Sequence, residues 1–160
     1  MTFALTHGDV TLRLLRQRDA KVLVLQHTDE LIEQNRIAIS RISGLPSSIV
    51  KAERDDWGGQ LVFGSVQTLA RANRREGMPV VSHLIIDECH RSIYNLWRQV
   101  LDYFDAFLVG LTATPDKRTY GFFNENVVAE YSYEQSVVDG VNVGYDVYEI
   151  ETEITAKGAE

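Results

Sequence analysis

Two adjacent carboxylates, Asp87 and Glu88, directly follow the apolar segment 84–86 and are the strongest candidates for chemistry. The segment has the composition of a buried strand, and carboxylates are unfavourable in a core, so the pair is expected to face a site at the strand's end. At the carboxyl end of a parallel strand, Asp87 could hold Mg²⁺ directly or through water. Glu88 could orient and deprotonate an attacking water, which suits phosphoanhydride hydrolysis. The alternative is a solvated acidic turn.

A second polar strand end follows the apolar segment 107–111. It has the sequence Thr112-Ala113-Thr114-Pro115, and proline stops the strand. Parallel strands meet their neighbours at one edge, so both hydroxyls are expected in the same crevice as the acids. There Thr112 and Thr114 could hydrogen-bond to the acids or to His90. Taken alone, this motif is more often just a strand that ends in a turn.

Two strand-to-helix turns have the composition of phosphate-binding turns. Backbone N–H groups and hydroxyls at a helix start can hold phosphate oxygens without reading bases. The candidates for nucleic-acid binding are His27, Thr28, Ser65, Gln67, Thr68 and Arg71, with Arg74 and Arg75 close behind. A solvated helix face is the alternative for these arginines.

Two other chemistries have weaker support. Cys89 and His90 could form a thiol–base pair, but adjacent side chains at a strand end usually diverge. The four histidines show no zinc-ligand spacing, and Cys89 is the only cysteine, so a zinc site has no second sulfur ligand. The single cysteine also excludes an internal disulfide and favours a reducing compartment.

Strand patterns alternate with helix patterns along the first two thirds of the chain, which predicts an α/β fold with a mostly parallel sheet covered on both faces. Strands are expected at 21–26, 48–50, 61–65, 84–87 and 107–112. Helices are expected near 3–14, at 29–43, 66–73 and 93–104. In the second helix Thr28 is the expected cap, Gly44 the expected end, and Leu31, Ala38 and Ile42 share a face.

The last third differs in pattern. It predicts a strand at 127–131, a short helix capped by Ser132, a turn at Asp139-Gly140, and an alternating strand over 141–154. Residues 155–160 have the composition of a linker.

Composition and charge narrow the classes of function. The 160 residues are 44% hydrophobic and 24% charged, as in an ordinary folded domain. The net charge is -7, but residues 1–118 hold 15 basic and 14 acidic groups, whereas residues 119–160 hold one basic and nine acidic. Any nucleic-acid surface must therefore be local. No apolar run approaches the roughly 18 residues of a membrane span, and no leader pattern opens the chain, so a cytoplasmic location is expected.

With DECH at 87–90 and Thr-Ala-Thr at 112–114, the sequence resembles the superfamily 2 helicase-like ATPases. The resemblance implies a RecA-like three-layer αβα fold and the cofactors ATP and Mg²⁺. It assigns the magnesium to Asp87, the catalytic base to Glu88, and a link between nucleotide and Thr-Ala-Thr to His90. Thr112 and Thr114 would couple the ATP state to nucleic-acid binding. Segments 27–31 and 65–69 match the family's nucleic-acid motifs.

Within that superfamily, segments 87–115 and 122–155 look most like the motor region of the restriction subunit of type I restriction-modification enzymes. This likeness implies duplex DNA, a second RecA-like lobe, and modification and specificity subunits as partners. A nuclease motif is not found. A DNA-repair or RNA helicase lobe, or a catalytically silent nucleic-acid-binding module, remains an alternative.

An ATPase of this type needs a glycine-rich loop ending in Gly-Lys-Thr, and no lysine of this sequence follows a glycine. By the resemblance, residues 1–4 align just after that loop, so the phosphate-loop strand is expected to be missing. Residues 1–154 would form an N-terminally truncated first lobe, and residues 155–160 would begin the linker to a second. We expect the isolated chain not to turn over ATP at a useful rate.

Overall fold

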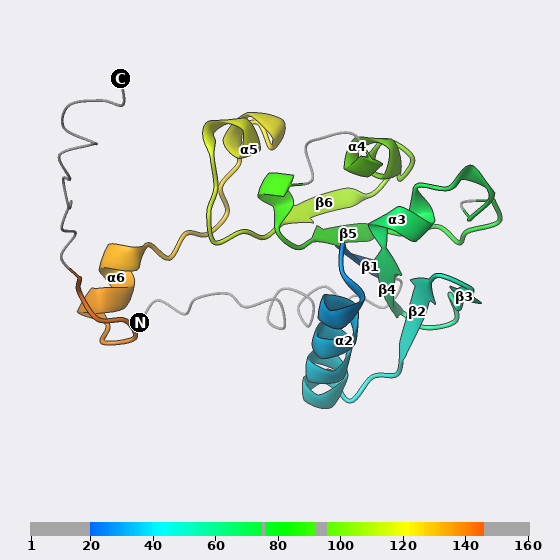
Figure 1. Ribbon diagram of the computed structural model, residues 1–160, viewed down its shortest axis with the longest axis horizontal. Coiled ribbons are helices and arrows are strands. Elements are labelled where there is room, and N and C mark those ends of the chain that lie inside the picture. The colour runs from blue at the N-terminus through cyan, green and yellow to red at the C-terminus, as the bar shows by residue number, and fades with distance from the viewer. Residues whose placement is uncertain (1–19, 75, 92–95, 146–160) are drawn as a thin grey trace, which may run out of the picture. The chain divides into compact units, whose positions relative to one another are not determined.

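A six-stranded sheet forms the centre of the part of the chain that this computed structural model describes, residues 20–74, 76–91 and 96–145 (Figure 1). Its order is β3-β2-β4-β1-β5-β6. The strands are β1 Val22–Gln26, β2 Ser47–Lys51, β3 Arg54–Asp55, β4 Leu61–Ser65, β5 His83–Ile86 and β6 Phe107–Gly110. All neighbours are parallel except β2 and β3, which form a short antiparallel hairpin. The predicted α/β fold is confirmed.

Helices cover both faces of the sheet and give it three layers (Figure 1). The odd and even residues of the central strands point to opposite faces, so β1 and β4 are buried throughout. On one face, Val22, Val24 and Phe63 pack with Ile32 and Ile39 of helix α2, Asp29–Ser43. On the other, residues of β1, β4 and β5 pack with helices α3, Val66–Leu69, and α4, Leu96–Leu101.

Helix α2, Asp29–Ser43, has the predicted ends. The Thr28 hydroxyl accepts a hydrogen bond from the Leu31 N–H, and Gly44 closes the helix at φ 68°, which favours glycine. Leu31, Ala38 and Ile42 share a face of this helix, but its buried residues are Ile32 and Ile39, and Ile42 is 59% exposed. The buried pair lies about 100° around the helix from the predicted stripe.

Two helices end earlier than predicted. Segment 66–73 divides into α3, Val66–Leu69, and a 3₁₀ turn at Ala72–Arg74, and α4 covers Leu96–Leu101. Helix α5, Lys117–Phe122, is not among the predicted elements, although Asp116 and Thr119 form a reciprocal capping box at its start. The predicted helix near 3–14 lies outside the described residues.

The chain divides into two compact units, residues 1–128 and 129–160. In the second unit, Ser132 caps α6, Tyr133–Val138, and Asp139-Gly140 forms a turn, both as predicted. The strand predicted at 127–131 is wrong: these residues have no strand partner in the described chain, and Val128 is 89% exposed. Residues 141–145 are also not a strand. Residues 146–160, with the predicted domain boundary, lie outside the described residues.

In the described chain, β6 pairs with β5 alone, and Phe107 and Leu108 on it are exposed. The described helices include none with the length and apolar character needed to cross a bilayer.

Candidate functional site

The register of the sheet brings four strand ends to one edge. Gln26 of β1 is aligned with Ser65 of β4, Leu25 with Ile86 of β5, and Ile86 with Gly110 of β6. All four strands run in the same direction, so the residues that follow them lie at their common carboxyl edge. The candidate catalytic and nucleic-acid-binding residues come from these strand ends.

Asp87 is held by donors at both carboxylate oxygens. Its Oδ1 accepts from the Glu88 backbone N–H at 3.0 Å, and its Oδ2 accepts from Gln26 Nε2 at 3.1 Å. Glu88 itself sits at φ 54°, a left-handed conformation that non-glycine residues rarely adopt. Such backbone strain persists only where surrounding structure enforces it, and it clusters at functional sites. The peptide after β5 therefore turns sharply at the acidic pair.

His90 joins the acidic pair to the threonine motif. Its Nδ1 lies 2.8 Å from Thr112 Oγ1, and its Nε2 lies 3.5 Å from Glu88 Oε2. Thr112 Oγ1 also accepts from the Thr114 N–H at 3.1 Å. A carboxylate only accepts, so Nε2 is the nitrogen that would donate to Glu88, and in the tautomer with that single ring proton Thr112 donates to Nδ1. The predicted contact between His90 and the Thr-Ala-Thr segment is thus present.

Cys89 belongs to the core. It is 2% exposed, and its N–H donates to the Leu111 carbonyl at 3.0 Å, which ties the acidic turn to the end of β6. Burial raises the pKa of the Cys89 thiol to about 11. A thiol that stays protonated at neutral pH is a poor nucleophile, so the geometry disfavours the thiol–base alternative.

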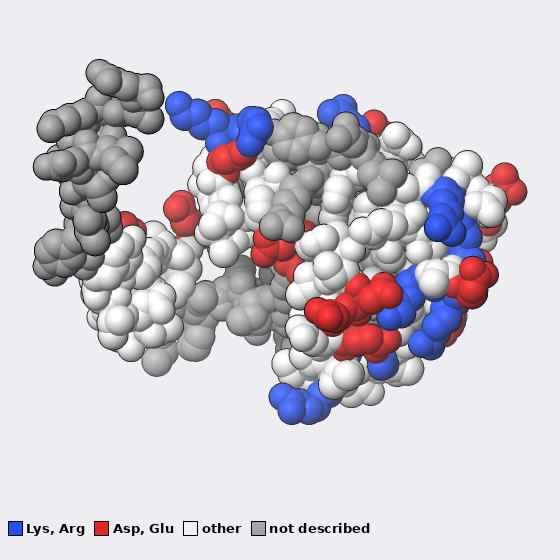
Figure 2. Space-filling view, in the orientation of Figure 1, with Lys and Arg blue, Asp and Glu red and all other residues white. Residues whose placement is uncertain are grey.

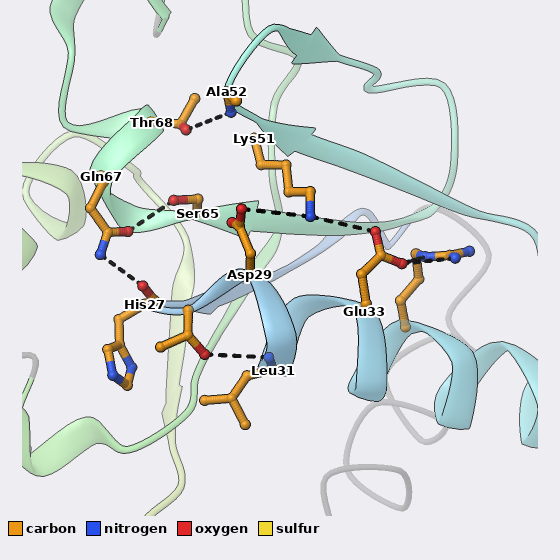
Figure 3. A network of polar contacts seen from close by, with 11 residues as sticks. His27, Asp29, Leu31, Glu33, Lys51, Ala52, Ser65, Gln67 and Thr68 are labelled. Carbon is orange, nitrogen blue, oxygen red and sulfur yellow. Dashed lines mark hydrogen bonds and ion pairs between the residues drawn. The ribbon is translucent and has the colours of Figure 1, made fainter.

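Gln67 connects the two predicted phosphate-binding turns (Figure 3). Its Nε2 donates to the His27 carbonyl at 2.7 Å, and its Oε1 accepts from Ser65 Oγ at 2.9 Å. The side chain is exposed and bridges the end of β4 to the end of β1. The structure therefore brings His27, Thr28, Ser65 and Gln67 together at neighbouring strand ends. Ser65 is only 6% exposed, so its hydroxyl orients Gln67 and does not itself face solvent, contrary to the predicted direct contact.

Thr68 does not join them. It is 5% exposed, and its hydroxyl accepts from the Ala52 N–H at 3.0 Å (Figure 3). Ala52 lies at φ 46° in the turn between β2 and β3, so Thr68 stabilises this turn and its hydroxyl does not face solvent. The predicted nucleic-acid contact of Thr68 is corrected accordingly.

The predicted arginine group is also divided. Arg74 donates to the Arg54 carbonyl at 2.8 Å and lies 3.6 Å from Asp55, so it braces β3. Arg71 is exposed beside α3, and Arg75 lies outside the described residues. Arg71 is therefore the described arginine of the group that stays at the surface as predicted.

Charges of both signs mix on the side of the first unit that carries α2 and β2 (Figure 2). Lys51 lies 3.8 Å from Asp29 and 3.5 Å from Glu33, and Glu33 also pairs with Arg36 (Figure 3). The Arg36 hydrogen bond is the main cause that lowers the Glu33 pKa. These pairs leave no broad basic field on that side, and sequence reasoning did not find them.

The carboxylate oxygens of Asp87 and Glu88 are ligands that suit a hard cation whose other ligands come from water or substrate. No group of three or more His, Cys, Asp or Glu side chains with metal-binding geometry occurs among the residues that the structure describes. Mg²⁺ commonly takes one or two carboxylates and completes its shell with water and substrate phosphates. Asp87 and Glu88 supply carboxylate oxygens of that kind, so the residues present fit Mg²⁺ bound with a phosphate ligand.

Gln26 is the candidate that the sequence did not reveal. It ends a run of buried apolar residues and was counted as part of the strand. Its contact with Asp87 depends on two strands 61 residues apart becoming neighbours, which no local pattern encodes. A polar residue at the end of a fully apolar strand, beside a predicted active-site strand, is the signal that could have identified it.

Comparisons with known proteins identify the family of the chain. The ResIII family profile, described as "Type III restriction enzyme, res subunit", matches residues 5–117. The chain is 37% identical over 84 residues to the "Type I restriction enzyme EcoAI endonuclease subunit" of Escherichia coli, covering 47% of this chain and 10% of that protein. It is 30% identical over 128 residues to the Saccharomyces cerevisiae protein named "Putative ATP-dependent helicase IRC3", covering 71% of this chain and 18% of that protein. The chain thus spans less than a fifth of these relatives.

Two solved structures share the fold. A nuclease-deletion mutant of the Type ISP restriction-modification enzyme LlaGI, in complex with a DNA substrate mimic, superposes with TM-score 0.63 at 19% identity, over 97% of this chain and 19% of that one. Dbp5 of S. cerevisiae, in a complex that contains ADP, gives TM-score 0.51 at 16% identity, over 66% and 32%. At these identities the likeness establishes a RecA-like lobe. With the profile covering most of its length, the chain belongs to the helicase-like ResIII family, whose description is the res subunit of type III restriction enzymes.

Proposed function

We propose that this chain is the nucleotide-facing and DNA-facing lobe of an ATP-dependent DNA translocase motor, of the kind found in the restriction subunit of type I restriction enzymes. The carrying observation is the continuous contact from Glu88 through His90 to Thr112. It joins the carboxylates suited to phosphoanhydride hydrolysis to a second strand end. The EcoAI subunit and the DNA-bound LlaGI structure support this class of motor.

In this proposal each side chain at the strand ends has a role set by its contacts. Asp87, with both oxygens already oriented, holds Mg²⁺ with the nucleotide phosphates. Glu88 is 40% exposed at its side chain, so it can reach a water and accept its proton. His90 and Thr112 connect the acidic turn at residues 87–88 to Thr114, so that a movement of the turn would reach the Thr-Ala-Thr segment. Bound ATP supplies the phosphoanhydride, and the ADP-containing relative supports nucleotide use.

The nucleic-acid part of the proposal rests on the turns after β1 and β4. His27, Thr28 and Gln67 contact phosphates there, with Arg71 nearby, and the buried Ser65 hydroxyl orients Gln67. Such contacts position a duplex without reading its sequence. A second RecA-like lobe, modification and specificity subunits and a cytoplasmic setting complete the proposal.

One observation favours a second candidate. The alignment with the yeast helicase-named protein is longer than that with the EcoAI subunit, 128 residues against 84. A helicase lobe of another class would use the same acids and turns, because translocation and strand separation are both driven by the same kind of ATP-hydrolysing lobe. Preference for duplex over single-stranded nucleic acid separates the two candidates.

The test is binding of a fluorescent 20-base-pair duplex to the 160-residue chain at 50 and 200 mM salt, with and without MgADP. We expect dissociation constants of about 10⁻⁴–10⁻⁶ M that weaken with salt and change with MgADP. Salt-sensitive binding that ignores nucleotide would favour the silent binding module. Tighter binding to the matching single strand would favour the helicase lobe. No binding at either salt concentration would contradict the proposal.

A further inference from the structure

Gln26 occupies an unusual position for a glutamine. It is the last residue of β1, is 1% exposed, and follows four fully buried apolar residues. β1 lies between β4 and β5 in the sheet, so Gln26 has a strand on either side. An apolar side chain of similar size would fill this place without burying polar atoms.

The amide of Gln26 is only half satisfied. Its Nε2 donates to Asp87 Oδ2 at 3.1 Å, whereas its Oε1 is buried and has no hydrogen-bond partner among the described residues. A buried acceptor without a partner is unfavourable, and buried polar groups in native proteins are nearly always paired. The one contact that Gln26 does make therefore has to account for its presence.

That contact completes the restraint of Asp87. Oδ1 is held by the Glu88 N–H and Oδ2 by Gln26, so donors on two different elements fix the position and the plane of the carboxylate. A carboxylate oxygen that accepts one hydrogen bond can also bind a cation, because it has two lone pairs. Groups that orient a metal ligand in this way typically change metal affinity by about 10- to 100-fold.

We propose that Gln26 is a positioning residue that presents the Asp87 carboxylate to a divalent cation. The proposal rests on the proposed function for the assignment of a cation to Asp87, and it goes further in naming the residue that prepares the carboxylate. The side-chain carbonyl of Gln26 stays without a hydrogen bond in the core, while its Nε2 orients the Asp87 Oδ2 that would bind the cation.

The test compares Gln26→Met with Gln34→Met in the 160-residue chain. Methionine keeps the length of the side chain and removes the donor, and Gln34 is exposed on α2, so it reports the same chemical change elsewhere. Mn²⁺, which shares the preference of Mg²⁺ for oxygen ligands, is the probe. Its free concentration is read by electron paramagnetic resonance, and Asp87→Asn defines the binding that belongs to Asp87. Urea unfolding is measured on every variant.

We expect Gln26→Met to raise the Mn²⁺ dissociation constant at Asp87 by about 10-fold. Its free energy of unfolding should equal or exceed that of the wild type, because an unpaired buried carbonyl is removed. In the wild type, Mn²⁺ should broaden the Gln26 side-chain amide signal in ¹⁵N spectra, which tests the contact even if a variant fails to fold. Gln34→Met should bind Mn²⁺ like the wild type.

The failures are distinguishable. Wild-type Mn²⁺ affinity in a folded Gln26→Met chain would overturn the positioning role and leave the proposed function standing. Loss of stability with unchanged Mn²⁺ affinity would likewise overturn it and make Gln26 purely structural. If Asp87→Asn removes no Mn²⁺ binding, both the positioning role and the metal role of Asp87 in the proposed function are contradicted.

Discussion

His90 contacts both polar strand ends through the two nitrogens of one ring. Its Nε2 faces Glu88, and its Nδ1 faces Thr112. The ring thus lies between the strained backbone at Glu88 and the Thr112 hydroxyl that follows β6. We infer that this ring carries the coupling that the proposed motor requires.

Replacing Thr112 with valine tests that arrangement. The change removes the hydroxyl that faces Nδ1, so the preference for a proton on Nε2 should weaken and the ring should populate both tautomers. Long-range ¹H–¹⁵N spectra of the His90 ring measure this directly. Thr114→Val is the matched control, since only its backbone N–H is bonded to Thr112. Unchanged ring nitrogen shifts in the Thr112 variant would show that the contact does not orient His90.

At the scale of elements, β6 and α5 meet at Gly110 without room for a side chain. A Cβ there would lie 2.5 Å from Phe123 Cζ and 2.9 Å from Cys89 Sγ. The acidic turn, the end of β6 and the end of α5 therefore pack against one another at this glycine.

Gly110→Ala should lower the free energy of unfolding by about 1–3 kcal/mol, because the phenyl ring and the buried thiol must both shift. Gly121→Ala is its control within α5, where a Cβ meets nothing within 4 Å. That variant should raise stability by about 0.5–1 kcal/mol. Urea denaturation measures both, and equal stabilities would contradict the close packing at Gly110.

The stability of the first turn of α5 should depend on pH. The Thr119 N–H, then the Arg118 and Thr119 side chains, hold the pKa of Asp116 well below its ordinary value. Because the folded-state pKa is lower than the unfolded value of about 3.9, the cap contributes fully above that pH and its contribution is lost as pH falls further.

We therefore expect the Thr119 amide signal to be constant from pH 7 to about pH 4 and to move in more acidic solution. Asp116→Asn keeps a capping oxygen but cannot titrate, so its Thr119 signal should stay constant over the same range. An equal pH response in both proteins would place the titrating group elsewhere.

The sequence predicted the strands in which nearly every consecutive residue is buried and the helix whose ends are marked by capping residues. Strands β1, β4 and β5 have apolar runs, and α2 has both of its caps written locally in Thr28 and Gly44. It did not predict β3, whose two residues are exposed. The Thr68 hydroxyl stabilises the turn before β3 by accepting from the Ala52 N–H, and Arg74 donates to the Arg54 carbonyl within it. Those bonds span 16 and 20 residues, beyond the reach of a periodic pattern.

The candidate site divides in the same way. Asp87, Glu88 and Thr112 stand out because polar residues end apolar strands, and their type suggests their chemistry. Gln26 and the bridge made by Gln67 depend on which strands become neighbours, so they require the fold. Thr68 was misassigned because its position after a strand does not tell whether its hydroxyl faces solvent or a neighbouring turn.

For the whole molecule, the net charge and the means of binding nucleotide phosphates limit the rate of ATP hydrolysis. The first 118 residues are nearly neutral, and no lysine follows a glycine anywhere in the chain. Without a phosphate cradle, the carboxylates and a cation can hold a nucleotide only weakly and do not orient its phosphates for hydrolysis.

We accordingly expect no useful MgATP turnover by the 160-residue chain, with or without duplex DNA, in a phosphate-release assay. Glu88→Gln should give the same background rate as the wild type. Glu53→Gln, an exposed residue away from the strand ends, is the matched control. DNA-stimulated turnover that only Glu88→Gln abolishes would refute this expectation.

The central claim is that one edge of the sheet binds a nucleotide at β5 and β6 and DNA at β1 and β4. It is tested most directly by following backbone amide signals of the ¹⁵N-labelled chain while MgADP and a short duplex are added separately. The account predicts that MgADP shifts residues 87–90 and 112–114, and that DNA shifts residues 27–28 and 65–67. Shifts by both ligands that spare these four segments would contradict it.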